Sequence, residues 1–155
     1  MLYLVFQLGK DRYAVDTAQI VEVLPLVNVK QIPQALPGAA GIFDYHGTLV
    51  PLIDLADLAL GEPSRRWMST RIILVNYHAE SGQTRLLGVL AEQATDTLRR
   101  TEEDFADAGL SGADTPYLGP ITTDAAGIVQ RIEIQNLLSE SLRNQLFLEP
   151  TASAQ

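Results

Sequence analysis

Two aspartates are the nearest approach to a catalytic pair in this chain. Asp44 and Asp54 both lie among apolar residues, and an apolar environment can raise the pKa of a carboxyl group toward the range useful for acid–base catalysis. An aspartic protease, however, needs Asp-Thr/Ser-Gly at a turn, and Asp44 is followed by Tyr45 and His46. We therefore expect Asp54 to end a strand and to cap the element that follows. A hydrolase that uses Asp44 or Asp54 remains an open alternative.

Metal chemistry has little support in the sequence. The two histidines, His46 and His78, do not stand at the spacing of paired metal ligands. The acidic run 102–104 with Asp107 lacks the spaced Gly and Glu of a calcium loop, so we expect a solvated acidic face there. The chain has no cysteine, which excludes disulfides, thiolate ligands and a cysteine nucleophile. We expect no metal and no cofactor.

Bulk composition favours one globular domain, or two very small ones that share a core. The chain has 155 residues, 46% hydrophobic and 19% charged, with a net charge of -8. This length suffices for a core without a disulfide or a metal, and the negative charge disfavours nucleic acid and anionic lipid as partners. The first residues resemble a strand more than a signal peptide, and no apolar run approaches the ~18 residues of a membrane helix. We expect a soluble cytoplasmic protein.

Short strands dominate the predicted secondary structure. Apolar and β-branched runs bounded by Gly, Pro and polar turns predict strands over 3–8, 13–15, 20–24, 41–47, 48–55, 71–77, 84–90, 94–100, 117–122 and 128–134. Asp16 is expected to cap a helical turn at 17–19, and leucine spacing predicts a terminal helix from about Glu133 to Leu146. Pro51 should place its strand at an edge or a bulge. Trp67, in the polar loop 61–69, is a candidate for partner contact.

The two halves of the chain share a weak repeat. Each half shows a hairpin, a further strand, a loop and a final hairpin that opens with Gly and ends in an apolar-Asp/Glu-apolar pattern. About ten short strands in two similar sets predict two small barrels, packed side by side across one apolar seam. A single β-sandwich is the alternative. We expect one domain over 1–148, with intertwined barrels at roughly 10–70 and 71–135 plus the N-terminal strand, and a flexible tail over 149–155.

Two stretches carry a resemblance to a known family. Residues 4–24 read LVFQLGKDRYAVDTAQIVEVL and resemble the opening of the CheW-like chemotaxis coupling proteins: an apolar strand, Leu-Gly, a polar turn, then Tyr, and a Val-x-Glu-aliphatic strand. Residues 41–55 read GIFDYHGTLVPLIDL and resemble the family's second signature, which ends in Val-Pro-aliphatic-aliphatic-Asp-Leu. Residues 86–90, LLGVL, are similar to a later strand of the family. The resemblance covers about Leu2 to Leu138.

The resemblance implies a scaffold and not an enzyme. It implies an all-β fold with a short C-terminal helix, in which two five-stranded SH3-like barrels flank a groove. Family members link the cytoplasmic tips of transmembrane chemoreceptors, the methyl-accepting proteins, to the regulatory domain of a CheA-like histidine kinase. No cofactor, nucleic acid or direct membrane insertion is implied, and the protein would reach receptor arrays through its partners. A small-ligand sensor that uses the groove, with Phe43, Tyr45 and Trp67 nearby, is the alternative.

The resemblance also implies a receptor-binding groove on the first barrel, with the kinase-facing surface expected on the second. Ile20 would offer an apolar contact to a helical hairpin, and Glu22 would pair with a basic side chain on the facing strand. The glycines would permit tight turns or close approach of the backbone, or would serve the barrel alone. The expected groove residues are Ile20, Glu22, Gly41, Phe43, Tyr45, His46, Gly47 and Gly88.

The hairpin tip of the second signature departs from the family pattern. Where the family usually has Asn-Leu-Arg-Gly, this chain has Asp44-Tyr45-His46-Gly47, so a titratable imidazole replaces a permanent cation. A contact between Glu22 and His46 would be weaker near neutral pH. We hypothesise that the chain serves a divergent array, for example one that controls surface behaviour instead of flagellar chemotaxis.

Overall fold

Strands and hairpins build most of the structure. The computed structural model describes residues 1–147 apart from 67, 80–81, 108, 110–111 and 113. Within these residues the strands are β1 (Leu2–Leu8), β2 (Asp11–Asp16), β3 (Ile20–Leu24), β4 (Ala39–Tyr45), β5 (Thr48–Asp54), β6 (Arg71–His78), β7 (Thr84–Arg99), β8 (Leu118–Asp124) and β9 (Gly127–Ile132). The helices are α1 (Leu55–Leu60) and α2 (Glu140–Leu146), and the short 3-10 turns are η1 (Thr17–Gln19), η2 (Glu102–Asp104) and η3 (Ile134–Asn136). No helix in this described part of the chain is long and apolar enough to cross a membrane.

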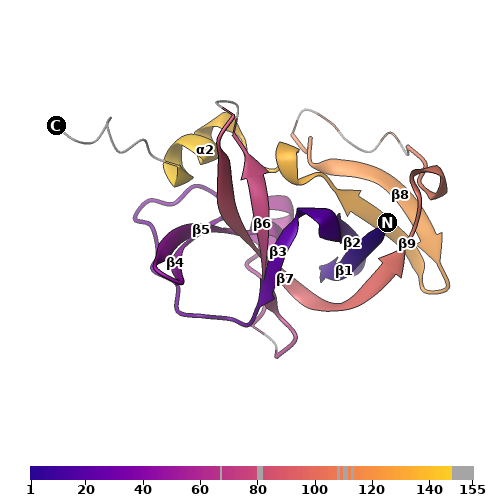
Figure 1. Cartoon of the computed structure of the whole chain (residues 1–155), viewed down its shortest axis with the longest axis horizontal. Coiled ribbons are helices and arrows are strands. Elements are labelled where there is room, and N and C mark those ends of the chain that lie inside the picture. The colour runs from indigo at the N-terminus through magenta and orange to yellow at the C-terminus, as the bar shows by residue number, and fades with distance from the viewer. Residues whose placement is uncertain (67, 80–81, 108, 110–111, 113, 148–155) are drawn as a thin grey trace.

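Two barrels share the long strand β7. In barrel 1, β3 pairs with β6, β6 pairs with the first half of β7 (84–91), and β7 runs parallel to β5, which pairs with β4. In barrel 2, the second half of β7 (92–99) pairs with β1, β1 with β2, β2 runs parallel to β9, and β9 pairs with β8. Figure 1 shows β4 and β5 on one side of the molecule and β8 and β9 on the other. The described strands thus form two five-stranded SH3-like barrels side by side, as predicted, and not a sandwich.

The two sequence repeats exchange their first hairpins. The β1–β2 hairpin opens the first half of the chain but lies in barrel 2, with β8 and β9. The hairpin of β6 and β7 opens the second half but lies in barrel 1, with β3, β4 and β5. This pairing differs from the expected division near residue 70, because the leading hairpin of each repeat completes the barrel of the other.

One continuous strand replaces two predicted ones. We predicted separate strands over 84–90 and 94–100, whereas β7 runs unbroken over Thr84–Arg99. Gln93 has a φ of 49°, and the register with β1 shifts between Val5 and Gln7 at the same level. The polar interruption in the apolar pattern therefore marks the bend by which β7 passes from one barrel to the other.

The terminal helix is shorter than predicted. We expected it over Glu133–Leu146, whereas α2 spans Glu140–Leu146 and the separate turn η3 precedes it. The Ser139 side chain accepts a hydrogen bond from the Leu142 N–H. A serine in this position caps the start of a helix, so the helical leucine spacing is interrupted there.

Asp54 joins β5 to α1, a helix that the sequence analysis did not predict. Its carboxylate accepts a hydrogen bond from the Asp57 N–H in the first turn of α1, and two more from the N–H and the hydroxyl of Ser64. Gly61, with a φ of 75°, ends the helix in the left-handed region. The predicted capping role of Asp54 is confirmed. The hydrogen bonds of this buried carboxylate fix the start of α1 and the chain at Ser64.

Pro51 occupies a position where its strand needs no N–H donor. It lies opposite Ile42, and both the N–H and the C=O of Ile42 bind Lys30 on the other side of β4. The pairing of β5 with β7 begins only at Leu52. The predicted edge position is therefore correct for this end of β5, although the strand as a whole lies between β4 and β7.

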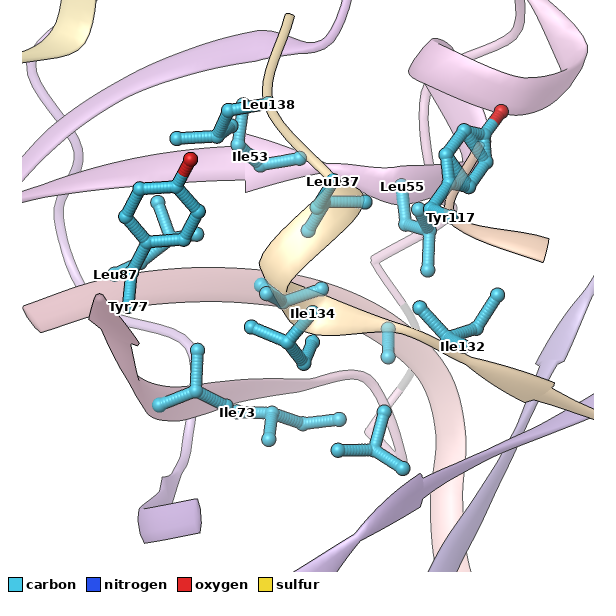
Figure 2. Close-up of a cluster of buried hydrophobic side chains, with 14 of the residues drawn as sticks. Ile53, Leu55, Ile73, Tyr77, Leu87, Tyr117, Ile132, Ile134, Leu137 and Leu138 are labelled. Carbon is cyan, nitrogen blue, oxygen red and sulfur yellow. The ribbon is translucent and has the colours of Figure 1, made fainter. Parts of the chain in front are cut away.

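The largest hydrophobic core lies between the barrels, as the sequence predicted. Buried side chains from β1 and β2 meet those from β5, β6 and β7, and η3 with the leucines after it fills the centre (Figure 2). We call this the seam cluster; among its members are Ile53, Leu55, Ile73, Tyr77, Leu87, Tyr117, Ile132, Ile134, Leu137 and Leu138. Smaller clusters fill the interior of barrel 1, around Phe43 and Val50, and of barrel 2, around Tyr3 and Val5.

An ion pair ties the β8–β9 hairpin to β2 in barrel 2. Arg12 donates through Nη1 and Nη2 to the two carboxylate oxygens of Asp124, at 2.7 and 2.8 Å. Asp124 also accepts from the Ala126 N–H inside the hairpin turn. The hydrogen bonds from Arg12 lower the pKa of Asp124 to about 2.

We predict that Asp124→Asn removes a pH-dependent part of the stability. The folded-state pKa lies below the ordinary value of ~3.9, so this contribution is complete above about pH 4 and is lost as the pH falls toward 2. The variant should lose about 1 kcal/mol of unfolding free energy at pH 7 and almost none at pH 2. Urea unfolding at both pH values measures this, with Glu103→Gln, an exposed carboxylate of the same barrel, as control. An equal loss at both pH values would contradict the prediction.

Candidate partner-binding surface

A hydrogen bond crosses from β4 to β3 at the edge of the interior of barrel 1. The Tyr45 hydroxyl donates to Glu22 Oε1 at 2.7 Å. Glu22 lies opposite Leu74 on β6, and Leu74 belongs to the interior cluster, so Glu22 stands on the interior face of its strand. Tyr45 packs against the same cluster. The two residues therefore close the rim of the barrel between strands that do not pair with each other.

The tip of the β4–β5 hairpin holds Tyr45 in place. His46 and Gly47 have φ values of 50° and 89°, the geometry of a tight two-residue turn that matches the twist of the strands. Asp44 Oδ1 accepts from the Gly47 N–H at 2.8 Å. The His46 ring packs edge-on against the Tyr45 ring, with centroids 4.4 Å apart. The turn and the ring contact together orient the donor to Glu22.

The observed partner of Glu22 is Tyr45, whereas the sequence analysis had considered His46. The hydrogen bond to Glu22 raises the pKa of the Tyr45 hydroxyl, because the ionised phenol would lose the proton that it donates. The hydroxyl therefore remains a donor at neutral pH. A neutral group orients the carboxylate without cancelling its charge.

Three of the expected groove residues lie inside barrel 1. Phe43 is 2% exposed and belongs to the interior cluster. A Cβ atom on Gly88 would lie 2.7 Å from Phe43 Cε1, and one on Gly41 would lie 2.4 Å from the Lys30 carbonyl oxygen. These three residues are buried and serve the packing of the barrel. The remaining expected residues, Ile20, Glu22, Tyr45, His46 and Gly47, are half-buried or exposed.

Strand β3 carries exposed apolar side chains that the sequence analysis did not select. Val21 is 44% and Val23 is 39% exposed. In the sheet formed by the described strands, β3 pairs with β6 alone and lies at the end of the strand order, and its register shifts between Ile20 and Glu22. The available signal was that residues 20–24 are apolar on both faces of a strand. Val23 lies opposite Ile73 of the seam cluster and therefore on the other face of the strand from Glu22. We call the exposed residues along this edge, on both faces of the strand, the β3 surface: Val21, Glu22 and Val23, with Tyr45 and His46.

The residues considered for catalysis and metal binding have structural roles. Asp44 caps the hairpin turn and Asp54 caps α1. In the acidic run, Glu102 accepts from Arg131 and Asp104 from the Thr101 N–H. Among the residues that the structure describes, no group of three or more His, Asp and Glu side chains could hold a metal ion.

The sensor alternative finds little support in the positions of its residues. Phe43 lies within barrel 1, and the space between the barrels is filled by the seam cluster. Trp67, the candidate for partner contact, lies outside the described residues. Of the two aromatic residues that the structure describes, Tyr45 reaches the surface, where it binds Glu22.

Comparisons with known proteins agree with this architecture. A family model described as a CheW-like domain matches residues 2–142. The chemotaxis protein CheW of Klebsiella aerogenes is 25% identical over 139 residues, which cover 88% of this chain and 81% of that protein. The crystal structure of the scaffolding protein TtCheW from Thermoanaerobacter tengcongensis is similar with a TM-score of 0.77 at 22% identity, over 89% of this chain and 87% of that one. At this identity the structural likeness concerns the fold.

Proposed function

The chain belongs to the CheW-like domain family, and on that premise we propose that it is a non-enzymatic scaffold that couples the cytoplasmic tips of chemoreceptors to a CheA-like histidine kinase. The observation that carries the proposal is the β3 surface, where one edge strand exposes Val21 and Val23 and also carries the ordered carboxylate of Glu22. An exposed apolar edge with a fixed polar group is typical of protein-binding surfaces. The structural roles of Asp44 and Asp54 support a function without chemistry.

The proposal assigns the two barrels different partners. The receptor tip binds the β3 surface of barrel 1, and the kinase regulatory domain binds barrel 2. The protein then works in the cytoplasm, at receptor arrays that it reaches through its partners. His46 stands at the hairpin tip where the family usually has Arg, and Glu22 accepts from the neutral hydroxyl of Tyr45. The receptor-facing rim therefore differs in charge from the family pattern. This difference favours a divergent array, such as a surface-sensing or non-flagellar one.

We predict that Val23→Asp uncouples the receptor while sparing the kinase. A charge introduced at the centre of an apolar contact must be desolvated, so affinity for a receptor cytoplasmic fragment should fall by about tenfold or more. The measurement is co-sedimentation of the purified protein with a chemoreceptor fragment and a CheA-like kinase encoded by the same genome, followed by kinase autophosphorylation. Wild-type protein should bridge the two and change the kinase rate.

A matched variant controls for the introduced charge. Ile128→Asp changes an aliphatic residue that is 62% exposed on barrel 2 and should leave receptor binding intact. Equal loss of receptor binding in the two variants would contradict the assignment of the receptor to barrel 1. Wild-type protein that binds neither the fragment nor the kinase would contradict the scaffold itself.

A further inference from the structure

Residues 31–37, between β3 and β4, form a loop whose two ends are fixed. Lys30, just before the loop, exchanges two backbone hydrogen bonds of 2.8 Å with Ile42 on β4. Gly38, just after the loop, donates its N–H to Asp57 Oδ2 on α1 at 2.9 Å. Any movement of the loop is therefore confined to the segment between these two anchors.

The middle of the loop covers the seam cluster but buries little of its own surface. Ile32 and Leu36 are half-buried against the cluster, and the other residues of the loop are exposed. A cleft of about 270 Å³ lies between Ile32 and Ala35 on the loop and Asp57 on α1. A segment with few buried contacts opens at a low cost in free energy. The loop therefore depends on contacts from other elements to stay closed.

One side chain of α2 supplies such a contact. The Leu36 N–H donates to Gln145 Oε1 at 2.9 Å, across 109 residues of chain, and Gln145 Nε2 donates to the Gln34 carbonyl oxygen at 3.2 Å. Gln34 has a φ of 54°, in the left-handed region that residues other than glycine rarely adopt. The loop is thus closed against backbone strain at the place where Gln145 binds it.

The position of α2 depends in turn on the seam. Leu142 and Leu146 are buried in the seam cluster, and the Phe147 ring stacks on Tyr77 of β6 with centroids 5.8 Å apart. A helix of seven residues is not stable in water by itself. Loss of this docking would therefore unfold α2 and withdraw Gln145 from the loop.

We propose that residues 31–37 are a lid over the seam cluster, and that α2 latches this lid through Gln145. Displacement of α2 opens the lid while both barrels stay folded, and it uncovers the apolar surface beneath Ile32 and Leu36. The latch is a property of the fold and does not rest on the scaffold function proposed above.

Native-state amide hydrogen exchange of the full chain, resolved by residue with NMR, tests the latch. Two amides report on the lid: Leu36, which donates to Gln145, and Ala39, which donates to the Leu36 carbonyl. The Ile42 amide, which donates to the Lys30 carbonyl, reports on the anchor in barrel 1. Gln145→Ala should accelerate exchange about fivefold at both lid amides and leave Ile42 unchanged.

Two further variants act on the latch without removing its amide. Leu146→Asp undocks the end of α2 and should accelerate the same two amides, although Gln145 is intact. Gln34→Gly keeps the carbonyl that Gln145 binds and relieves the positive φ, so both lid amides should exchange about threefold more slowly. Asn144→Ala, at an exposed neighbour on α2, is the matched control and should leave exchange in the lid unchanged.

The pattern of exchange separates the lid from simpler explanations. Acceleration of Leu36 alone in Gln145→Ala would mean that one hydrogen bond was lost, and it would overturn the lid. Equal acceleration of Ile42 in Gln145→Ala or Leu146→Asp would mean that the barrel opens as a whole, and it would overturn the lid as well. Unchanged lid exchange in Leu146→Asp would overturn the role of α2, and faster exchange in Gln34→Gly would overturn closure against strain.

Discussion

Replacing Gly41 with alanine should cost about 3 kcal/mol of unfolding free energy, because the added methyl group meets the backbone of Lys30 as well as the side chain of Val29. An added Cβ would lie 2.4 Å from the Lys30 carbonyl oxygen and 2.5 Å from Val29 Cγ1, at a φ of +146°. Lys30 and Ile42 exchange two hydrogen bonds of 2.8 Å there, and this bridge closes barrel 1 on the side of β4. The methyl group can fit only if the bridge opens.

Gly47→Ala is the matched control for this prediction. Gly47 also has a positive φ, of +89°, but a Cβ there would meet nothing within 4 Å. Gly47→Ala should therefore lose only the unfolding free energy that corresponds to the strain of the left-handed backbone, about 1 kcal/mol. Urea unfolding of the two variants gives the difference, about 2 kcal/mol, which is the cost of displacing Lys30 and Val29. Equal losses would show that φ alone matters at both positions and that the bridge contributes nothing.

Three glycines of the family signatures show what local sequence could not predict, namely which glycine forms a turn and which one allows another residue to approach closely. Gly41, Gly47 and Gly88 are equally plausible as turn formers or as points of close approach when only their neighbours in sequence are known. Gly47 forms a hairpin turn, and the spacing of the flanking strands was sufficient to predict it. Gly41 and Gly88 must lack a side chain because Lys30 and Phe43 approach them closely. These contacts form only once the barrel has closed.

Hairpins were predictable for the same local reason, and their assignment to barrels was not. Apolar runs around short turns identified β1–β2, β4–β5 and β8–β9, because both strands and the turn lie within one short segment. The parallel pairs β2–β9 and β5–β7 join residues from opposite halves of the chain. No local pattern specifies which of two similar barrels a hairpin completes, so the exchange of leading hairpins became visible only in the structure.

The candidate site was likewise predictable only in part: its residues could be selected from the sequence, but their contacts and exposure could not. The family signatures led to Glu22 and Tyr45, but the bond between them joins strands that are not neighbours in the sheet. The exposure of Val21 and Val23 depends on β3 lying at the end of the strand order. In a central strand the same residues would be buried, since apolar residues on both faces are typical of a covered strand. The exposure of Val21 and Val23, on which the proposed receptor site depends, therefore follows from the position of β3 in the sheet.

The location of the main core between the barrels makes the two barrels one thermodynamic unit. Ile73 on β6 is fully buried in the seam cluster, and Ile73→Ala should cost about 3 kcal/mol through lost burial and the cavity left behind. Because both barrels line that cavity, amide hydrogen exchange should accelerate in β1 and β2 as much as in β5 and β6. Leu49→Ala, at a side chain 72% exposed on β5, should change stability by less than about 0.5 kcal/mol.

The exchange pattern is decisive, since a small interface and a shared core predict different results. If the seam were only a contact between two stable barrels, Ile73→Ala would accelerate exchange in barrel 1 and leave the protection of β1, β2, β8 and β9 unchanged. The interior clusters of the single barrels are small, centred on Phe43 and Val50 in one and on Tyr3 and Val5 in the other. Neither has enough buried apolar surface to hold five short strands alone. Loss of protection in both barrels together is therefore the expected result, and it would mean that a partner bound to the β3 surface of barrel 1 also stabilises barrel 2.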